Sequence, residues 1–86
     1  MNINELIEII KKKIESNIET ENINIEDKSF LHKNHKSNQK GKFHLKISLK
    51  SKQLNKLNRI EANKKIHKIL HQEINLFIHS IQISIN

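Results

Sequence analysis

The chain lacks the residue types on which several classes of protein depend. It contains no cysteine, proline, tryptophan or tyrosine, and Gly41 is its only glycine. Without cysteine it can form no disulfide framework, zinc knuckle, thiol nucleophile or iron–sulfur site of its own. One glycine excludes a P-loop and a glycine-rich dinucleotide turn, and no nucleophile elbow is present. We therefore expect a protein that is not an enzyme.

The chain also lacks a long hydrophobic run and a recognisable targeting sequence. No apolar stretch approaches the roughly 18 residues of a membrane span. Glu5 and Glu8 precede any lysine, unlike the start of a signal or transit peptide. We expect a cytoplasmic protein without membrane contact, with the mitochondrial matrix as the alternative after removal of a presequence. The 86 residues predict one domain, residues 1–86, because a second core would need roughly 50 more residues.

Charge of one sign dominates most of the chain. Its net charge is +7. Residues 1–27 carry seven acids against three lysines, whereas residues 28–86 carry thirteen basic residues against Glu61 and Glu73. Such an asymmetric field attracts an anionic partner, either nucleic acid or an acidic protein face. An ordinary lysine-rich surface that only keeps the protein solvated explains the same composition.

Apolar residues are mainly isoleucine, and their spacing near the start of the chain predicts a helix. The chain contains 17 isoleucines and eight leucines. Spacings of three and four residues place six of those near the start on one helical face. Asn2 is the expected N-cap, with Glu5 three residues later as in a capping box. The apolar face consists of Ile3, Leu6, Ile7, Ile10, Ile14 and Ile18.

Three later segments alternate between polar and apolar residues, as strands do. They are residues 22–25, Phe43–Lys50 and residues 79–85. Residues 28–42 are rich in lysine, asparagine and serine and predict a long polar loop. Residues 57–74 show a second helical stripe, and residues 51–57 allow a short helical turn before it. That stripe consists of Ala62, Ile66, Ile69, Leu70 and Glu73.

The expected order of elements is therefore α-β-β-α-β. Three strands with one apolar face need a cover, and amphipathic helices supply it. We expect an α+β fold, a two-layer sandwich whose three-stranded mixed sheet is covered by helices on one face. The last strand–helix–strand passage is expected to be a right-handed crossover between parallel strands.

Several histidines are candidates for chemistry. His67 and His71 have a metal-binding spacing, but neighbouring lysines oppose a cation, which favours two exposed helix histidines. His32 and His35 lie in the polar loop and alone are a weak metal signal. His79 opens the last strand in phase with its isoleucine face. Taken alone, a histidine there is more often satisfied by a backbone hydrogen bond.

Four passages of the chain carry a family resemblance. They are Asp27-Lys28-Ser29-Phe30-Leu31-His32, His44-Leu45-Lys46-Ile47-Ser48-Leu49-Lys50-Ser51, Leu70-His71-Gln72-Glu73-Ile74 and Ile78-His79-Ser80-Ile81-Gln82-Ile83. Together they resemble the BolA family over nearly the whole chain, and the spacing from the central strand to His79 is the specific part. The chain departs from that family in the main helix, which has Ala62-Asn63-Lys64 where Arg-His-Arg is usual, and at Lys56, where a glycine is usual.

The resemblance implies a fold similar to class II KH domains and a role in iron–sulfur cluster assembly, trafficking or sensing. BolA proteins pair with a monothiol glutaredoxin around a shared [2Fe–2S] cluster. On this chain the first ligand would be His79 and the loop ligand His32, with His35 as a substitute. The glutaredoxin cysteine and glutathione would supply the rest. The isolated chain would bind no cluster and would be a monomer that forms a heterodimer with glutaredoxin.

The alternative is a KH-like transcription regulator that binds nucleic acid through its basic surface. KH recognition uses a GxxG loop, which one glycine cannot form, and aromatic stacking platforms are scarce. We therefore expect weak and salt-sensitive binding. The same charge would also suit an acidic glutaredoxin surface. The candidate residues for the nucleic-acid or acidic-partner face are Lys46, Lys50, Lys64 and Lys65.

Overall fold

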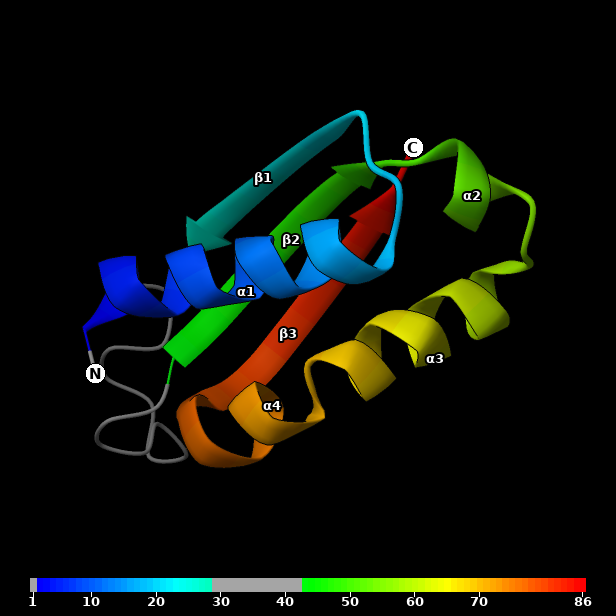
Figure 1. Ribbon diagram of the computed structural model, residues 1–86. Helices are drawn as coiled ribbons and strands as arrows, with labels where there is room; N and C mark the ends of the chain where they lie inside the picture. Colours follow the sequence, from blue (N-terminus) through cyan, green and yellow to red (C-terminus); the bar gives the residue numbers. More distant parts are fainter. Residues whose placement is uncertain (1, 29–42) are drawn as a thin grey trace.

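The computed structural model describes residues 2–28 and 43–86 (Figure 1). Most of the expected polar loop, including His32 and His35, lies outside the described residues. No helix in the described part of the chain is long and apolar enough to cross a membrane. The elements are α1 (Ile3–Asn17), β1 (Asn22–Asp27), β2 (Phe43–Lys50), α2 (Lys52–Asn55), α3 (Arg59–Ile69), α4 (His71–Phe77) and β3 (Ile78–Ile85).

The strands form one three-stranded mixed sheet in the order β1-β2-β3. β1 is antiparallel to β2, and β2 is parallel to β3. In Figure 1, α1 crosses one face of the sheet, and α3 and α4 run on the same side beside β3. The two-layer α+β sandwich expected from the sequence is confirmed.

α1 forms where the capping and apolar spacing predict it. The Asn2 side-chain oxygen accepts a hydrogen bond of 2.9 Å from the Glu5 backbone N–H, which satisfies a donor that the helix start leaves free. Leu6, Ile10 and Ile14 have no exposed surface. Their burial faces α1 onto the sheet, and each fully buried side chain stabilises the fold by roughly 1.5–3 kcal/mol.

The core lies between the helices and the central strand. Ile47 of β2 and Ile66 of α3 are fully buried, and β1 contributes half-buried side chains. The core is almost entirely aliphatic, so the fold depends on close packing of branched side chains rather than on aromatic rings. Its members are Leu6, Ile10, Ile14, Ile18, Leu45, Ile47, Leu49, Leu54, Ala62, Ile66, Leu70 and Ile78.

The second half of the chain differs from the expectation in one respect. The single helix expected over residues 57–74 is two helices, α3 and α4, which meet at Leu70 with φ −99° and ψ 14°. α3 begins only at Arg59 because Asn58 caps it, accepting a 2.8 Å hydrogen bond from the Glu61 N–H. The Leu70 side chain is fully buried, so the bend keeps the apolar stripe on the core.

One ion pair between described residues joins α1 to α4. The Lys13 ammonium of α1 lies 2.6 Å from a Glu73 carboxylate oxygen of α4. Glu73 is 5% exposed, and its other oxygen, Oε1, has no hydrogen-bond partner among the described residues. A buried carboxylate is costly unless it is paired. Lys13 therefore compensates the negative charge of Glu73, which lies on the otherwise apolar stripe of the second half of the chain.

Replacing Lys13 by alanine tests this pairing. We expect Lys13→Ala to lower the free energy of unfolding by about 1–2 kcal/mol, below the full cost of breaking a buried pair because the lysine itself is partly exposed. Urea denaturation measures the change. Lys12→Ala, at an exposed position one residue away, is the matched control and should change stability by less than about 0.5 kcal/mol. Equal effects of the two substitutions would contradict the assignment.

Candidate functional site

A shift in strand register places His79 at the start of β3. Phe43 pairs with Ile78, but the next residue of β2, His44, pairs with Ser80, so His79 is an extra residue in β3. Such a β-bulge turns a side chain out of the regular alternation and is common beside functional sites. Ile81, Ile83 and Ile85 are half-buried, whereas His79 is exposed. The expected phase of His79 with the isoleucine face therefore does not bury it.

A second histidine lies beside His79. His44 alternates with Leu45 along β2, so it lies on the sheet face that no described helix covers, the open face. Its side chain is nevertheless buried there, with 3% exposed. Its Nδ1 atom is 2.6 Å from the Ser80 hydroxyl oxygen, which holds the ring in place. The His44 and His79 ring centroids are 4.8 Å apart, with an angle of 63° between the ring planes. One fixed imidazole thus contacts the edge or face of an exposed one.

The sequence placed His44 in a strand pattern and in a passage that resembles the BolA family, but His44 was not predicted as a site residue. A signal for it was nevertheless present. Neighbouring parallel strands begin at the same end of a sheet. His44 and His79 are each the second residue of their strand. A parallel pairing of the two strands therefore predicts that these rings meet.

The described residues can contribute to a metal centre but cannot build one. Imidazole is a good ligand for zinc, copper and iron, and His79 is exposed. Within residues 2–28 and 43–86, however, no group of three or more His, Cys, Asp or Glu residues lies close enough to hold a metal ion. His67 and His71 are both exposed and lie on either side of the bend at Leu70. The arrangement at His79 suits a site that another donor set completes.

The two loop histidines predicted as ligands, His32 and His35, lie outside the described residues. The last described residue before them, Lys28, donates a backbone hydrogen bond of 2.7 Å to the His44 carbonyl oxygen. The first described segment therefore ends, at Lys28, next to His44. Whether His32 or His35 reaches the pair stays a prediction.

The four predicted lysines lie on two different layers. Lys46 and Lys50 are in β2 on the open face of the sheet, whereas Lys64 and Lys65 are in α3. Acids accompany the first pair: Lys46 is opposite Glu26 in the strand register, and Lys50 lies 3.6 Å from Glu21. The structure therefore does not bring the four together into one basic surface.

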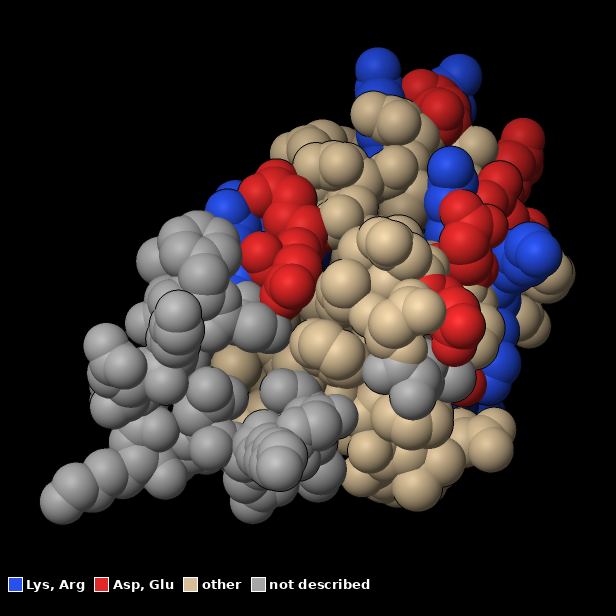
Figure 2. Space-filling view, turned by 90° about the vertical axis from the view of Figure 1, so that its left-hand side faces the viewer, with Lys and Arg blue, Asp and Glu red and all other residues tan. Residues whose placement is uncertain are grey.

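Acidic and basic side chains are intermixed at the end of the molecule shown in Figure 2. Just after the end of β1, the Lys28 ammonium hydrogen-bonds the Glu26 carboxylate and lowers its pKa, and the charge of Lys46 contributes a smaller effect in the same direction. The positive charge on the open face is therefore partly compensated by β1. A partner that docks there would meet a mixed surface.

Comparisons with known proteins agree on one family. A family model described as BolA-like protein matches residues 14–86. Among solved structures, BolA1 from Arabidopsis thaliana superposes with a TM-score of 0.76 at 20% identity, covering 92% of this chain and 87% of that one. The BolA domain of SufE1 from Arabidopsis thaliana gives a TM-score of 0.78 at 19% identity, with the same two coverages.

A more distant structure has the same fold. A bol-like protein from Babesia bovis superposes with a TM-score of 0.70 at 12% identity, covering 91% of this chain and 79% of that chain. A comparison with curated proteins gave no significant match. At these identities the solved structures show the fold, and the family model carries the membership.

The Ser80 hydroxyl is expected to hold the histidine pair in position. Ser80→Ala should lower the free energy of unfolding by about 0.5–1.5 kcal/mol, the usual cost of a lost hydrogen bond. It should also shift the ring NMR signals of both His44 and His79, because the rings are in contact. Ser84→Ala is the matched control, since Ser84 lies on the same strand face and makes no side-chain hydrogen bond among the described residues. Unchanged ring signals in Ser80→Ala would refute this role.

Proposed function

We propose that this chain, which belongs to the BolA-like family, acts as the partner of a monothiol glutaredoxin and supplies histidine ligands to a shared [2Fe–2S] cluster. The family is generally non-enzymatic. The proposed role is therefore in the assembly, trafficking or sensing of iron–sulfur clusters. The proposed setting is the cytoplasm, with the mitochondrial matrix as the alternative.

The exposed ring of His79 is the observation that supports this proposal most directly. It projects from a bulge at the end of the sheet, where a partner can approach it, and the buried His44 ring backs it at 4.8 Å. A neutral imidazole can replace a thiolate at the iron of a [2Fe–2S] cluster, as it does in Rieske centres. His79 would therefore hold one iron, and His44 would hold the His79 ring in a defined orientation.

The composition of the chain supports a shared rather than a resident cluster. The 86 residues contain no cysteine, and the described residues include no cluster of three metal-binding side chains. The remaining ligands would come from the glutaredoxin cysteine, from glutathione, and from His32 or His35. The [2Fe–2S] cluster would be the cargo that this chain and the glutaredoxin hold between them. We propose that the isolated chain is a monomer without a cluster and that it forms a heterodimer with glutaredoxin.

The open face of the sheet is the proposed docking surface for glutaredoxin. Lys46 lies two residues after His44 on the same side of β2 and is half-buried. A partner whose cysteine approaches His79 would cover this part of the sheet. Lys64 and Lys65, on α3 in the helical layer, would remain outside that contact.

A titration tests the ligand role of His79. The chain is added to a [2Fe–2S]-loaded monothiol glutaredoxin dimer, and visible circular dichroism follows the cluster. We expect a new spectrum that reaches a plateau near one equivalent and that His79→Ala abolishes. His67→Ala, which removes another exposed histidine from α3, is the matched control and should leave the spectrum as in the unmodified chain.

Two outcomes of that titration would overturn the proposal. If the spectrum does not change and the glutaredoxin dimer stays intact, the chain does not share its cluster. If His79→Ala gives the same new spectrum as the unmodified chain, a cluster is shared without His79. In the first case, nucleic-acid binding through the basic residues becomes the leading function for the net charge of +7.

Charge reversal tests the docking surface. Lys46→Glu should weaken glutaredoxin binding by about three- to tenfold, mainly by slowing association, because a charge at the rim of an interface acts chiefly on the encounter. Calorimetry measures the affinity. Lys64→Glu makes the same change in net charge on α3 and should have less than a twofold effect. A larger effect at Lys64 would instead place the docking surface on the helical layer.

A further inference from the structure

β3 forms an outer edge of the sheet, and beyond the bulge at His79 it carries no charged residue or proline to protect that edge. Its eight residues, Ile78–Ile85, include no lysine, arginine, aspartate, glutamate, proline or glycine. The strand at the other edge, β1, ends in Glu26 and Asp27. Edge strands normally carry charges or proline because their free N–H and C=O groups pair with other chains. In the described part of the chain, no strand pairs with the outer edge of β3.

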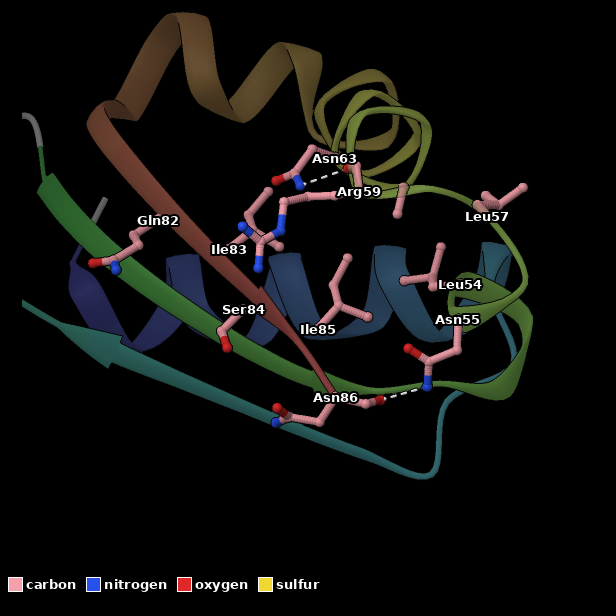
Figure 3. A pocket seen from close by; sticks show the side chains of 11 residues that line it. Leu54, Asn55, Leu57, Arg59, Asn63, Gln82, Ile83, Ser84, Ile85 and Asn86 are labelled. Carbon is pink, nitrogen blue, oxygen red and sulfur yellow. Dashed lines mark hydrogen bonds between the residues drawn. The ribbon is translucent and has the colours of Figure 1, made fainter.

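A groove runs along this free edge. It has a volume of about 540 Å³ and is lined by the second half of β3, by α2 and the turn after it, and by the first turns of α3. Figure 3 shows Leu54 and Ile85 toward one end of it, with the Asn55 and Asn86 polar groups beside them. The Asn55 side-chain amide donates a hydrogen bond of 2.7 Å to the Asn86 backbone oxygen, which ties α2 to the end of β3.

Among the described residues that line this groove, Arg59 is the only one with a charged side chain. In Figure 3 it reaches from the start of α3 toward β3, near Ile83. It makes no ion pair with any residue that the structure describes. Nearby, the Asn63 side-chain N–H donates a hydrogen bond of 2.8 Å to the Arg59 backbone carbonyl oxygen, so it contacts the main chain of Arg59 and not its guanidinium. A guanidinium presents a planar fork of donors that matches a carboxylate.

We propose that the outer edge of β3 and this groove bind an extended acidic peptide of a partner protein, which adds to the sheet as a fourth strand. Main-chain hydrogen bonds to the free edge would supply affinity, and alternate side chains would enter the groove. A carboxylate of the peptide would pair with Arg59. This binding is independent of the proposed cluster role, because the groove begins at Gln82 and extends to Asn86, away from the histidine pair.

The composition of the groove favours a peptide over nucleic acid. A nucleic-acid strand carries one phosphate per nucleotide and is normally bound by several cations together with aromatic stacking platforms. The described residues that line the groove offer one cation and no aromatic side chain. A free strand edge, by contrast, presents the alternating donors and acceptors that another polypeptide needs.

Charge also disfavours a second copy of this chain. Two copies joined through β3 would bring together two chains of net charge +7, which repel each other. β3 carries no acid to pair with Arg59 of the other copy. An acidic strand from another protein satisfies both the free edge and the unpaired guanidinium.

Selection from a random peptide library is the first arm of the test. Twelve-residue peptides displayed on phage are selected against the full chain, with the Arg59→Glu chain used to remove unspecific binders. We expect enrichment of peptides that alternate β-branched residues with other residues and contain aspartate or glutamate. No enrichment over background, or enrichment of peptides without an acid, would overturn the proposal.

The second arm measures one enriched peptide as a synthetic probe by fluorescence anisotropy. Arg59→Glu should weaken binding at least tenfold, and a peptide with lysine in place of its key acid should bind Arg59→Glu better than it binds the unmodified chain. Lys12→Glu, on an exposed position of α1, is the matched control for net charge and should stay within twofold. Thermal unfolding confirms that each variant is folded, which is expected because a glutamate suits the first turn of a helix.

The third arm locates the peptide. Hydrogen exchange of the complex should slow at backbone amides of β3 and leave those of β1 unchanged. Slowed exchange only outside β3, or equal affinity of the unmodified and Arg59→Glu chains for the probe, would refute the proposed site. Binding of a twelve-nucleotide single-stranded DNA to the groove in place of peptides would also refute the proposal. So would dimers of the chain, seen by ultracentrifugation, that Arg59→Glu abolishes.

Discussion

The parallel pairing of β2 with β3 is the constraint on which the rest of the structure depends. It joins two strands separated by three helical segments, so α2, α3 and α4 must all fit within the crossover. It also brings the starts of both strands to the same end of the sheet, where the His44 and His79 rings come into contact. The single extra residue in β3 turns His79 outward. One backbone pairing therefore sets both the core and the candidate site.

The same pairing separates two surfaces of different chemistry. At the start of β3, the His44 and His79 rings contact each other near the mixed charges of the open sheet face. Toward the end of β3, the free edge and Arg59 suit an extended acidic chain. The two proposed binding sites therefore lie at opposite ends of one strand.

Much of the fold and part of the site were predictable. The alternation in Phe43–Lys50 has the same bounds in the structure, and the isoleucine spacing of α1 predicted its buried face. The bend at Leu70 was not predictable, because the apolar stripe continues through it unchanged. His79 was predicted from family resemblance, but its exposure was not, because nothing in the local pattern of residues 79–85 signals the bulge. His44 was overlooked because its partner, Ser80, lies 36 residues away.

The sequence by itself determined the order of the elements and which residues of each face the core. Those properties follow from periods of two and 3.6 residues, which are local features of the backbone. Only the tertiary structure decided that His79 is turned outward by a bulge, that Lys64 and Lys65 lie on a different layer from Lys46 and Lys50, and that no described strand pairs with the outer edge of β3. These properties depend on the register between distant segments, and a shift of one residue turns a side chain to the opposite face. The candidate site at His79 is the consequence of such a shift.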